Sequence, residues 1–228
     1  MKEGLYLNKS ERKIISCENS NGNISCNNQF EPEIGFYLSQ NITAPLIQCT
    51  SSLGNTVCSY SNVADGYYPT YPTPGDEDEL YLIKCSSNVC EKIKNSSGWY
   101  KSGEVGKAII HCDGVKMECN SIVMPKLGYY VNGNGNDVSG NYLLNCLIEG
   151  KGVNCKEYKP TGITIGSKYF KNAAFTTFEN EKVLIKCNNE GCGVPFEIEN
   201  SNTYYVNGVN SQLIYYIAEG ICNEFPVN

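Results

Sequence analysis

Short groups of aromatic and apolar residues recur along the chain, separated by polar stretches rich in glycine and asparagine. One kind starts with glycine and two mostly aromatic positions, as in Gly66-Tyr-Tyr and Gly98-Trp-Tyr. A second kind is a brief apolar segment that ends in cysteine, as in Leu82-Ile-Lys-Cys85. In a strand, positions two apart share a face, which places Ile83 with Cys85. The period of two predicts β-strands rather than helices.

The two kinds of group alternate along the whole chain, so the sequence is a tandem repeat. The aromatic group has clear copies at Gly4, Gly35, Gly66, Gly98 and Gly128, and weaker copies at Lys168 and Thr203. Corresponding cysteines are about 33 residues apart, a period typical of repeat arrays. We expect one array over residues 1–228, with repeats at approximately 4–34, 35–65, 66–97, 98–127, 128–160, 161–201 and 202–228. Wider spacing between Pro160 and Glu181 leaves open a break between two structural units near residue 160.

Cysteine is the most informative residue type, with thirteen in 228 residues. In six repeats a second cysteine follows the first after four, six or eight residues. An even number is what directly opposite positions of a short-turn hairpin require, and such positions lie within disulfide reach. The intervening residues are turn formers. The spacing predicts the disulfides Cys17–Cys26, Cys49–Cys58, Cys85–Cys90, Cys112–Cys119, Cys146–Cys155 and Cys187–Cys192.

Metal binding is the alternative use of these cysteines. Zinc sites favour cysteines two to four residues apart with a second pair nearby, and spacings of six and eight fit this poorly. The single histidine, His111, stands where other repeats have serine, glutamine, lysine or asparagine, so we interpret it as an ordinary strand residue. We expect neither a metal nor a cofactor.

A repeat of about 33 residues cannot bury a sufficient core alone. Each disulfide-closed loop should add roughly 2–3 kcal/mol of stability, and stacking on neighbours should supply the rest. The predicted fold is therefore all-β: an elongated tandem array of about seven disulfide-stapled β-hairpin repeats. The pattern does not decide between a solenoid-like stack and continuous antiparallel sheets.

Three positions of the aromatic group have separate roles. The third position is nearly always tyrosine, which indicates fixed packing with a hydroxyl that reaches a partner. The fifth is always asparagine, serine or threonine, which suits a local turn that ends the strand. The second position varies from leucine to tryptophan, and it forms either inter-repeat core or a contact surface. In the second case Trp99, Tyr67 and Tyr129 are the candidate partner-binding residues.

Residues 69–79 depart from the repeat and form a proline-rich, acidic excursion around Tyr71. The segment is either a solvated loop or a docking loop that uses Tyr71, Asp76 and Asp78. It lacks the twelve-residue pattern of a calcium-binding loop, which argues against calcium.

Charge and cysteine content narrow the partners and the compartment. The net charge of −6 and the pI near 5 argue against nucleic acid, because phosphate binding needs clustered Lys and Arg. The apolar runs are too short to span a membrane. The cysteine density indicates an oxidising compartment, and sequons at Asn8, Asn23, Asn41 and Asn95 are compatible with secretion. We interpret the chain as a fragment of a longer secreted, extracellular protein.

The order of the motifs resembles the repeats of scaffoldins from anaerobic gut fungi, which are very large secreted proteins that organise cellulosomes. Gly66-Tyr-Tyr, Leu82-Ile-Lys-Cys85 with Cys90, Gly128-Tyr-Tyr-Val-Asn132, and Leu143-Leu-Asn-Cys146 with Cys155 carry the resemblance. It covers essentially the whole chain. The resemblance implies a non-catalytic, cohesin-like module that binds the dockerin modules of plant-cell-wall-degrading enzymes, within a cellulosome or at the cell surface.

The residues themselves also favour a binding protein over an enzyme. The sequence has no Cys/His or Ser/His constellation, no phosphate-binding glycine loop and no carboxylate pair at a fixed place in the repeat. Two other functions stay open: direct binding of polysaccharide by the aromatic rows, and a cell-wall adhesive or structural array.

The odd cysteine gives a first prediction. Tyr216 occupies the place of the first cysteine in the last repeat, so we expect Cys222 to be an unpaired thiol. Thiol titration of the denatured, non-reduced chain with peptide mapping should find one reactive thiol, located at Cys222. A bridge between cysteines of different repeats, or between two molecules, is the competing outcome and would overturn the pairing.

Overall fold

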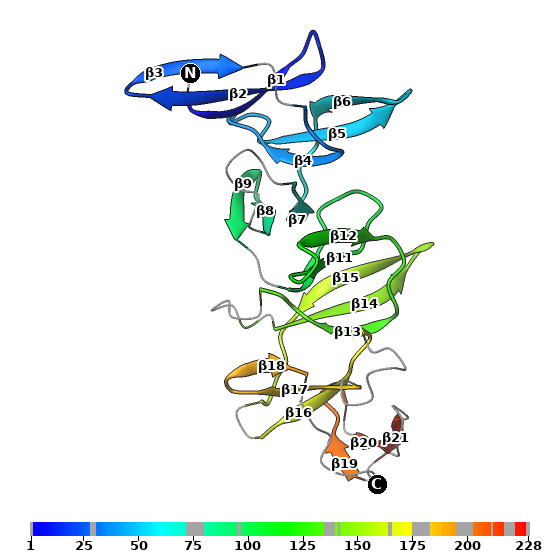
Figure 1. Ribbon diagram of the computed structural model, residues 1–228. Helices are drawn as coiled ribbons and strands as arrows, with labels where there is room; N and C mark the ends of the chain where they lie inside the picture. The colour runs from blue at the N-terminus through cyan, green and yellow to red at the C-terminus, as the bar shows by residue number, and fades with distance from the viewer. Residues whose placement is uncertain are drawn as a thin grey trace. The chain divides into compact units, whose positions relative to one another are not determined.

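The computed structural model describes residues 2–27, 31–71, 80–94, 97–134, 140, 142–163, 166–174, 183–194, 203–210, 212–216 and 222–226. Throughout these ranges the regular secondary structure is β-strand alone. The strands form seven antiparallel sheets, each built from three strands consecutive in the chain (Figure 1). The structure confirms the predicted all-β tandem array of small, disulfide-containing repeats.

Each strand of a sheet contains one of the motifs of the repeat. The first strands are the aromatic groups: β1 (Gly4–Asn8), β4 (Gly35–Leu38), β7 (Gly66–Pro69), β10 (Gly98–Lys101), β13 (Gly128–Val131), β16 (Lys168–Lys171) and β19 (Thr203–Val206). The second strands are the apolar segments: β2 (Lys13–Ser20), β5 (Leu46–Ser52), β8 (Tyr81–Ser86), β11 (Ile109–Asp113), β14 (Leu143–Glu149), β17 (Leu184–Asn188) and β20 (Gln212–Tyr216). The third strands follow the hairpin turn: β3 (Asn23–Asn27), β6 (Asn55–Tyr60), β9 (Val89–Lys94), β12 (Glu118–Ile122), β15 (Gly152–Tyr158), β18 (Gly191–Gly193) and β21 (Cys222–Pro226).

The strand register places the two cysteines of a repeat directly opposite each other. Cys17 pairs with Cys26, and Cys146 with Cys155, as Cα partners across their hairpins. Disulfides join Cys17–Cys26, Cys49–Cys58, Cys85–Cys90, Cys112–Cys119, Cys146–Cys155 and Cys187–Cys192, with Cα–Cα distances of 4.0 to 4.1 Å. These are the six pairs that the even spacing predicts. Cys222 is a free cysteine opposite Tyr216, and burial raises the pKa of its thiol.

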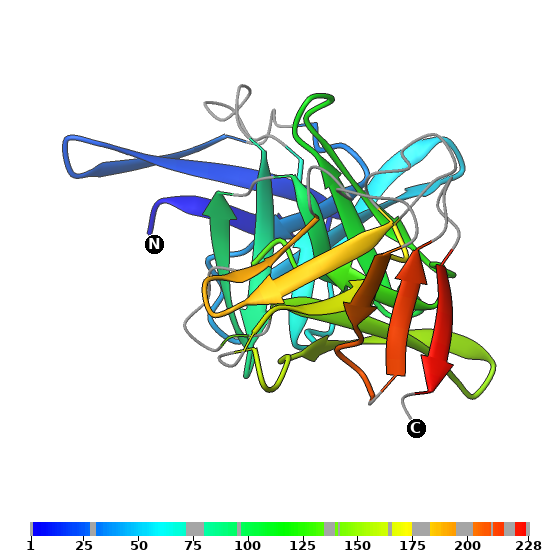
Figure 2. The same cartoon turned by 90° about the horizontal axis from the view of Figure 1, so that it is seen from below.

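Beyond the disulfide, the hairpin extends as a two-stranded finger. In the first repeat β1 pairs with β2 only as far as Cys17, whereas β2 and β3 stay paired to Ser20 and Asn23. Figure 2 shows this finger in blue, extending past the end of β1. The residues of the turn are therefore covered by no third strand.

The chain divides into two compact units, one of residues 1–96 and 102–121 and the other of residues 97–101 and 122–228. The division falls within the fourth repeat, not near residue 160. In the first unit, hydrophobic clusters combine residues of neighbouring repeats: Phe36 and Leu46 of the second repeat pack with Tyr68 and Ile83 of the third. In the second unit, Leu143 of the fifth repeat packs with residues of the sixth in the same way.

A single parallel β-bridge accompanies each of these clusters. The second position of one aromatic group faces the fifth position of the next, in the pairs Leu5–Ser39, Phe36–Thr70, Tyr67–Ser102, Trp99–Asn132, Tyr129–Asn172 and Tyr169–Asn207. The N–H that follows the fifth position donates to the second-position carbonyl, from Gln40 to Leu5 at 2.9 Å and from Gly133 to Trp99 at 2.7 Å. The sheets therefore stay three-stranded, and the bridged pair links neighbouring sheets without merging them.

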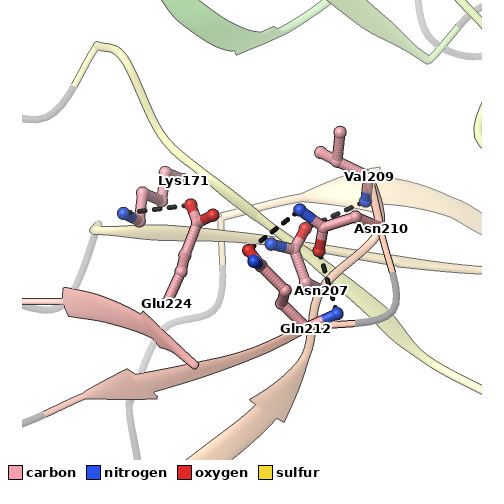
Figure 3. Close-up of polar contacts among 6 residues, drawn as sticks. All are labelled: Lys171, Asn207, Val209, Asn210, Gln212 and Glu224. Carbon is pink, nitrogen blue, oxygen red and sulfur yellow. Dashed lines mark hydrogen bonds and ion pairs between the residues drawn. The ribbon is translucent and has the colours of Figure 1, made fainter. Parts of the chain in front are cut away.

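The fifth-position side chain ends the strand by a local turn, as the sequence predicts. Its oxygen accepts a hydrogen bond from the backbone N–H two residues on: Asn41 to Ser39 at 3.1 Å, and Val209 to Asn207 at 2.9 Å. Figure 3 shows the turn at Asn207. Next to it, two hydrogen bonds join Asn210 and Gln212. Figure 3 also shows the Lys171–Glu224 ion pair at 3.1 Å, which joins the sixth repeat to the seventh.

The third-position tyrosine is anchored by its own backbone. Its hydroxyl donates to the carbonyl four residues earlier in Tyr6, Tyr37, Tyr68 and Tyr130, at 2.8 to 3.0 Å. The hydroxyl of Tyr68 also lies 2.9 Å from the carbonyl of Gly103 in the next repeat, so its single proton is shared between the carbonyls of Ala64 and Gly103. The rings of Tyr37, Tyr68 and Tyr130 are buried, which favours the neutral phenol, and burial raises the pKa of Tyr130 to about 12.

Glycine at the first position allows the next repeat to approach closely. Gly66 has φ of +147°, and a Cβ there would lie 2.7 Å from the backbone nitrogen of Gly103. Backbone atoms cannot move aside as a flexible side chain can, so a larger residue would force the two repeats apart.

We predict that Gly66→Ala lowers the free energy of unfolding by about 2–5 kcal/mol, because it adds both a clash and backbone strain. Gly22→Ala is the matched control: its φ is +86°, but the new Cβ would meet open space. It should cost only about 1–2 kcal/mol. Denaturant unfolding of the two variants measures both effects, and equal losses would contradict the close-approach argument.

We also predict that stability falls at alkaline pH. The contribution of Tyr130 is fully present below about pH 10, the pKa of an unfolded tyrosine, and is lost as the pH rises to about 12. The slope should be up to about 1.4 kcal/mol per pH unit for this residue. Unfolding of Cys222→Ser, which lacks the thiol that would exchange with disulfides, gives the reference curve. Adding Tyr130→Phe should flatten that curve; an unchanged slope would show that Tyr130 is not responsible.

Candidate functional site

The second-position aromatic row packs mainly between repeats. Tyr67 is only 2% exposed, and Phe36 lies edge-on to Tyr68 with ring centroids 5.0 Å apart. Trp99 packs against Tyr130 at 4.7 Å. The inter-repeat interpretation therefore holds for Tyr67, which is too deeply buried to serve as a surface contact.

Trp99 and Tyr129 are half-buried, so part of each side chain still reaches solvent. Tyr129 packs against Phe170 at 4.9 Å and Tyr158 at 5.3 Å, and burial raises the pKa of its hydroxyl. The amide of Asn145 also donates to that hydroxyl at 3.5 Å. These contacts make Tyr129 chiefly a packing residue.

Trp99 lies at the edge of a groove of about 660 Å³ in the second unit, which we call the Trp99 groove. It lies over three consecutive repeats, and its polar lining includes Ser97, Asn132, Asn172, Lys186, Asn188 and Glu190. Asn132 is 3% exposed and forms the turn that closes β13. The groove thus combines one indole ring with amide groups and one charge of each sign. Such a lining suits a neutral, polar ligand that can stack on a ring and accept or donate hydrogen bonds.

Tyr71 borders a second groove, of about 780 Å³, in the first unit; we call it the Tyr71 groove. The side chain of Tyr71 is 41% exposed. Three glutamates and one lysine line the groove: Glu11, Glu31, Glu33 and Lys13. The other two residues predicted on this excursion, Asp76 and Asp78, lie outside the described residues.

The hairpin fingers expose apolar side chains, a feature that sequence reasoning missed. Leu53, Val89, Val115 and Ile148 lie between the two cysteines of four different repeats, and all are exposed. Their positions differ from hairpin to hairpin, so no repeated motif marks them. The only sequence feature that could have identified these exposed side chains is an apolar residue within a predicted turn.

Metal-ligand clusters and shifted pKa values are the features that would mark a metal or acid–base centre among the titratable residues that the sequence singles out. Within the part of the chain that the structure describes, no three His, Cys, Asp or Glu side chains come together as metal ligands. His111 lies on β11 next to the disulfide cysteine Cys112, and burial lowers the pKa of its imidazole. The nearby Asp113 accepts hydrogen bonds from the Val115 and Lys116 N–H groups, which lower the pKa of its carboxyl group and fix the hairpin turn.

The Trp99 groove could be foreseen only in part. Its Asn132 is the fifth-position residue bridged to Trp99, and it stands one repeat length further along the chain. Lys186 and Glu190 belong to the sixth repeat, and only the stacking of sheets brings them to the same groove. The glutamates of the Tyr71 groove follow no repeated spacing.

Comparisons with known protein families, with curated proteins and with solved structures find no match. No helix among the described residues is long and apolar enough to cross a membrane. What the fold itself defines is a disulfide-rich, all-β repeat protein. Its six disulfides indicate an oxidising, extracellular type of environment.

Proposed function

We propose that this chain is a non-catalytic, cohesin-like binding module that recruits dockerin-bearing, plant-cell-wall-degrading enzymes to a secreted fungal scaffoldin. The sequence resemblance suggests this role. The observation that carries it is how the repeat uses its constant positions: the first, third and fifth positions and the cysteines are all engaged in the fold.

Because the constant positions are occupied, recognition falls to residues that differ between repeats. The Trp99 groove contains such residues, among them Trp99, Lys186 and Glu190, next to the fifth-position residues Asn132 and Asn172. A partner that fills it would contact several repeats at once, which favours a folded protein module over a ligand of one repeat. Aromatic residues in partly buried settings are also the common hot spots of protein interfaces.

Direct carbohydrate binding is the second candidate, and one observation favours it. The Trp99 groove combines an indole with the amides of Asn172 and Asn188. Stacking on a ring together with amide hydrogen bonds suits a sugar, which has both apolar faces and hydroxyl groups.

Two retention assays separate the candidates. Immobilised chain incubated with the secretome of the source organism should retain enzymes that mass spectrometry identifies as dockerin-bearing. The chain alone should pass through insoluble cellulose. Retention on cellulose without dockerin-bearing enzymes would favour the carbohydrate function and reject the scaffold proposal.

For a purified dockerin obtained in this way, we predict that Trp99→Ala weakens affinity about 30-fold or more, as expected for a hot-spot aromatic worth about 2 kcal/mol. Tyr204→Ala is the control, since Tyr204 is 57% exposed, occupies the same position of the repeat and does not line the groove. Titration calorimetry gives both affinities, and circular dichroism checks the fold. Equal affinities for Trp99→Ala and the unaltered chain would remove the Trp99 groove from the interface.

A further inference from the structure

The Tyr71 groove combines three features that act on the same ligand: an aromatic ring, an apolar wall and unbalanced negative charge. It is bounded by the turn before β2 and the first residue of β2, the segment before β4, the start of β6, and Tyr71, which lies two residues after β7. All of these lie in the first unit. The groove is therefore a feature of one compact body.

The ring of Tyr71 is held in place by the repeat itself. Tyr71 follows the fifth position of the third repeat, and its ring edge lies against Gly35 of the second. A Cβ at Gly35 would be only 2.6 Å from the ring carbon Cδ2. Glycine thus allows the ring to seat against the backbone, while 41% of the side chain stays exposed. A fixed aromatic ring binds a ligand at little cost in conformational entropy.

The apolar wall lies next to this ring. Ile34 lines the groove with 52% of its side chain exposed, and Pro32 and Val57 contribute the rest of the apolar surface. A ligand segment with an aliphatic stem could bury these side chains together with the ring.

The charge of the groove is not neutralised internally. Glu11, Glu31 and Glu33 face a single cation, Lys13. Within the described ranges, no ion pair involves any of these three carboxylates. The groove consequently presents an excess of negative charge next to a ring face, the combination that attracts Lys and Arg side chains.

We propose that the Tyr71 groove docks a segment of the partner protein that carries a Lys or Arg side chain between apolar residues. The alkyl stem of the basic residue packs on Tyr71 and Ile34, and its cationic head lies among the glutamates. This inference rests on the proposed function for the identity of the partner, the dockerin module. It places a second, electrostatic contact on the first unit, separate from the Trp99 groove.

The test uses the whole chain and two probes. One is the purified dockerin; the other is a pair of eight-residue peptides that differ only in carrying two lysines or two glutamates between leucines.

Tyr71→Ala should weaken binding of the dockerin and of the lysine peptide about tenfold, whereas Tyr71→Phe, which keeps the ring, should leave both affinities within twofold of the unaltered chain. The double variant Glu11→Gln, Glu33→Gln should give a loss that is largest at low salt and shrinks at 0.5 M salt. Glu18→Gln is the matched control, an exposed glutamate of β2 outside the groove.

The outcomes distinguish this inference from the proposed function. Dockerin binding that is unaffected by Tyr71→Ala overturns the docking site and leaves the scaffold function standing. Binding of the lysine peptide at Tyr71 without any binding of dockerin supports a basic ligand and rejects the scaffold function. Equal affinity for the lysine and glutamate peptides overturns the charge argument. Thermal unfolding of each variant shows that losses do not come from misfolding.

Discussion

The fold depends on covering the aromatic strand of each repeat with the next repeat. A single sheet of three short strands has too little apolar surface to be stable alone. In the hydrophobic clusters that join two repeats within the described residues, the second-position side chain of one repeat packs with the third-position ring of the next, as Phe36 packs with Tyr68. The bridging hydrogen bonds, such as Gly133 to Trp99, fix how closely the backbones approach. This close approach leaves no room for a side chain at the first position, which explains the glycine there.

The disulfides stabilise a different part of each repeat, the hairpin of its second and third strands. Each lies at the end of the three-stranded part of the sheet, where the hairpin continues as an uncovered finger. Cys49 and Cys58 belong to the cluster that contains Tyr37 and Ile47, so this disulfide is also part of the core. Closing the hairpin at that point limits the unfolded chain and keeps the strand edges paired. The fingers can then carry exposed apolar residues such as Leu53 without loss of structure.

Some positions of the repeat are used to form the fold, and the remaining positions are available for binding. Positions that recur are engaged in hydrogen bonds, close backbone contacts or disulfides, and they are nearly the same in every repeat. The residues that distinguish the Trp99 groove from the Tyr71 groove, such as Lys186 and Glu33, stand at positions that vary or between strands. The two grooves differ in charge, since the first is nearly balanced and the second is acidic. Each groove therefore suits a ligand of different charge.

The sequence alone determined the elements that repeat. Period-two patterning, even cysteine spacing and the fifth-position polar residue express local geometry, so they predict the strands, the six disulfide pairs and the turn at Asn207 without knowledge of the tertiary structure. Tertiary structure decided what depends on which repeat surfaces meet. The burial of Tyr67, the half-burial of Trp99 and the exposure of Tyr71 follow from the side chains of neighbouring repeats. Position in the motif does not predict these differences, because the exposure of each ring also depends on residues of neighbouring repeats that lie outside the repeated pattern.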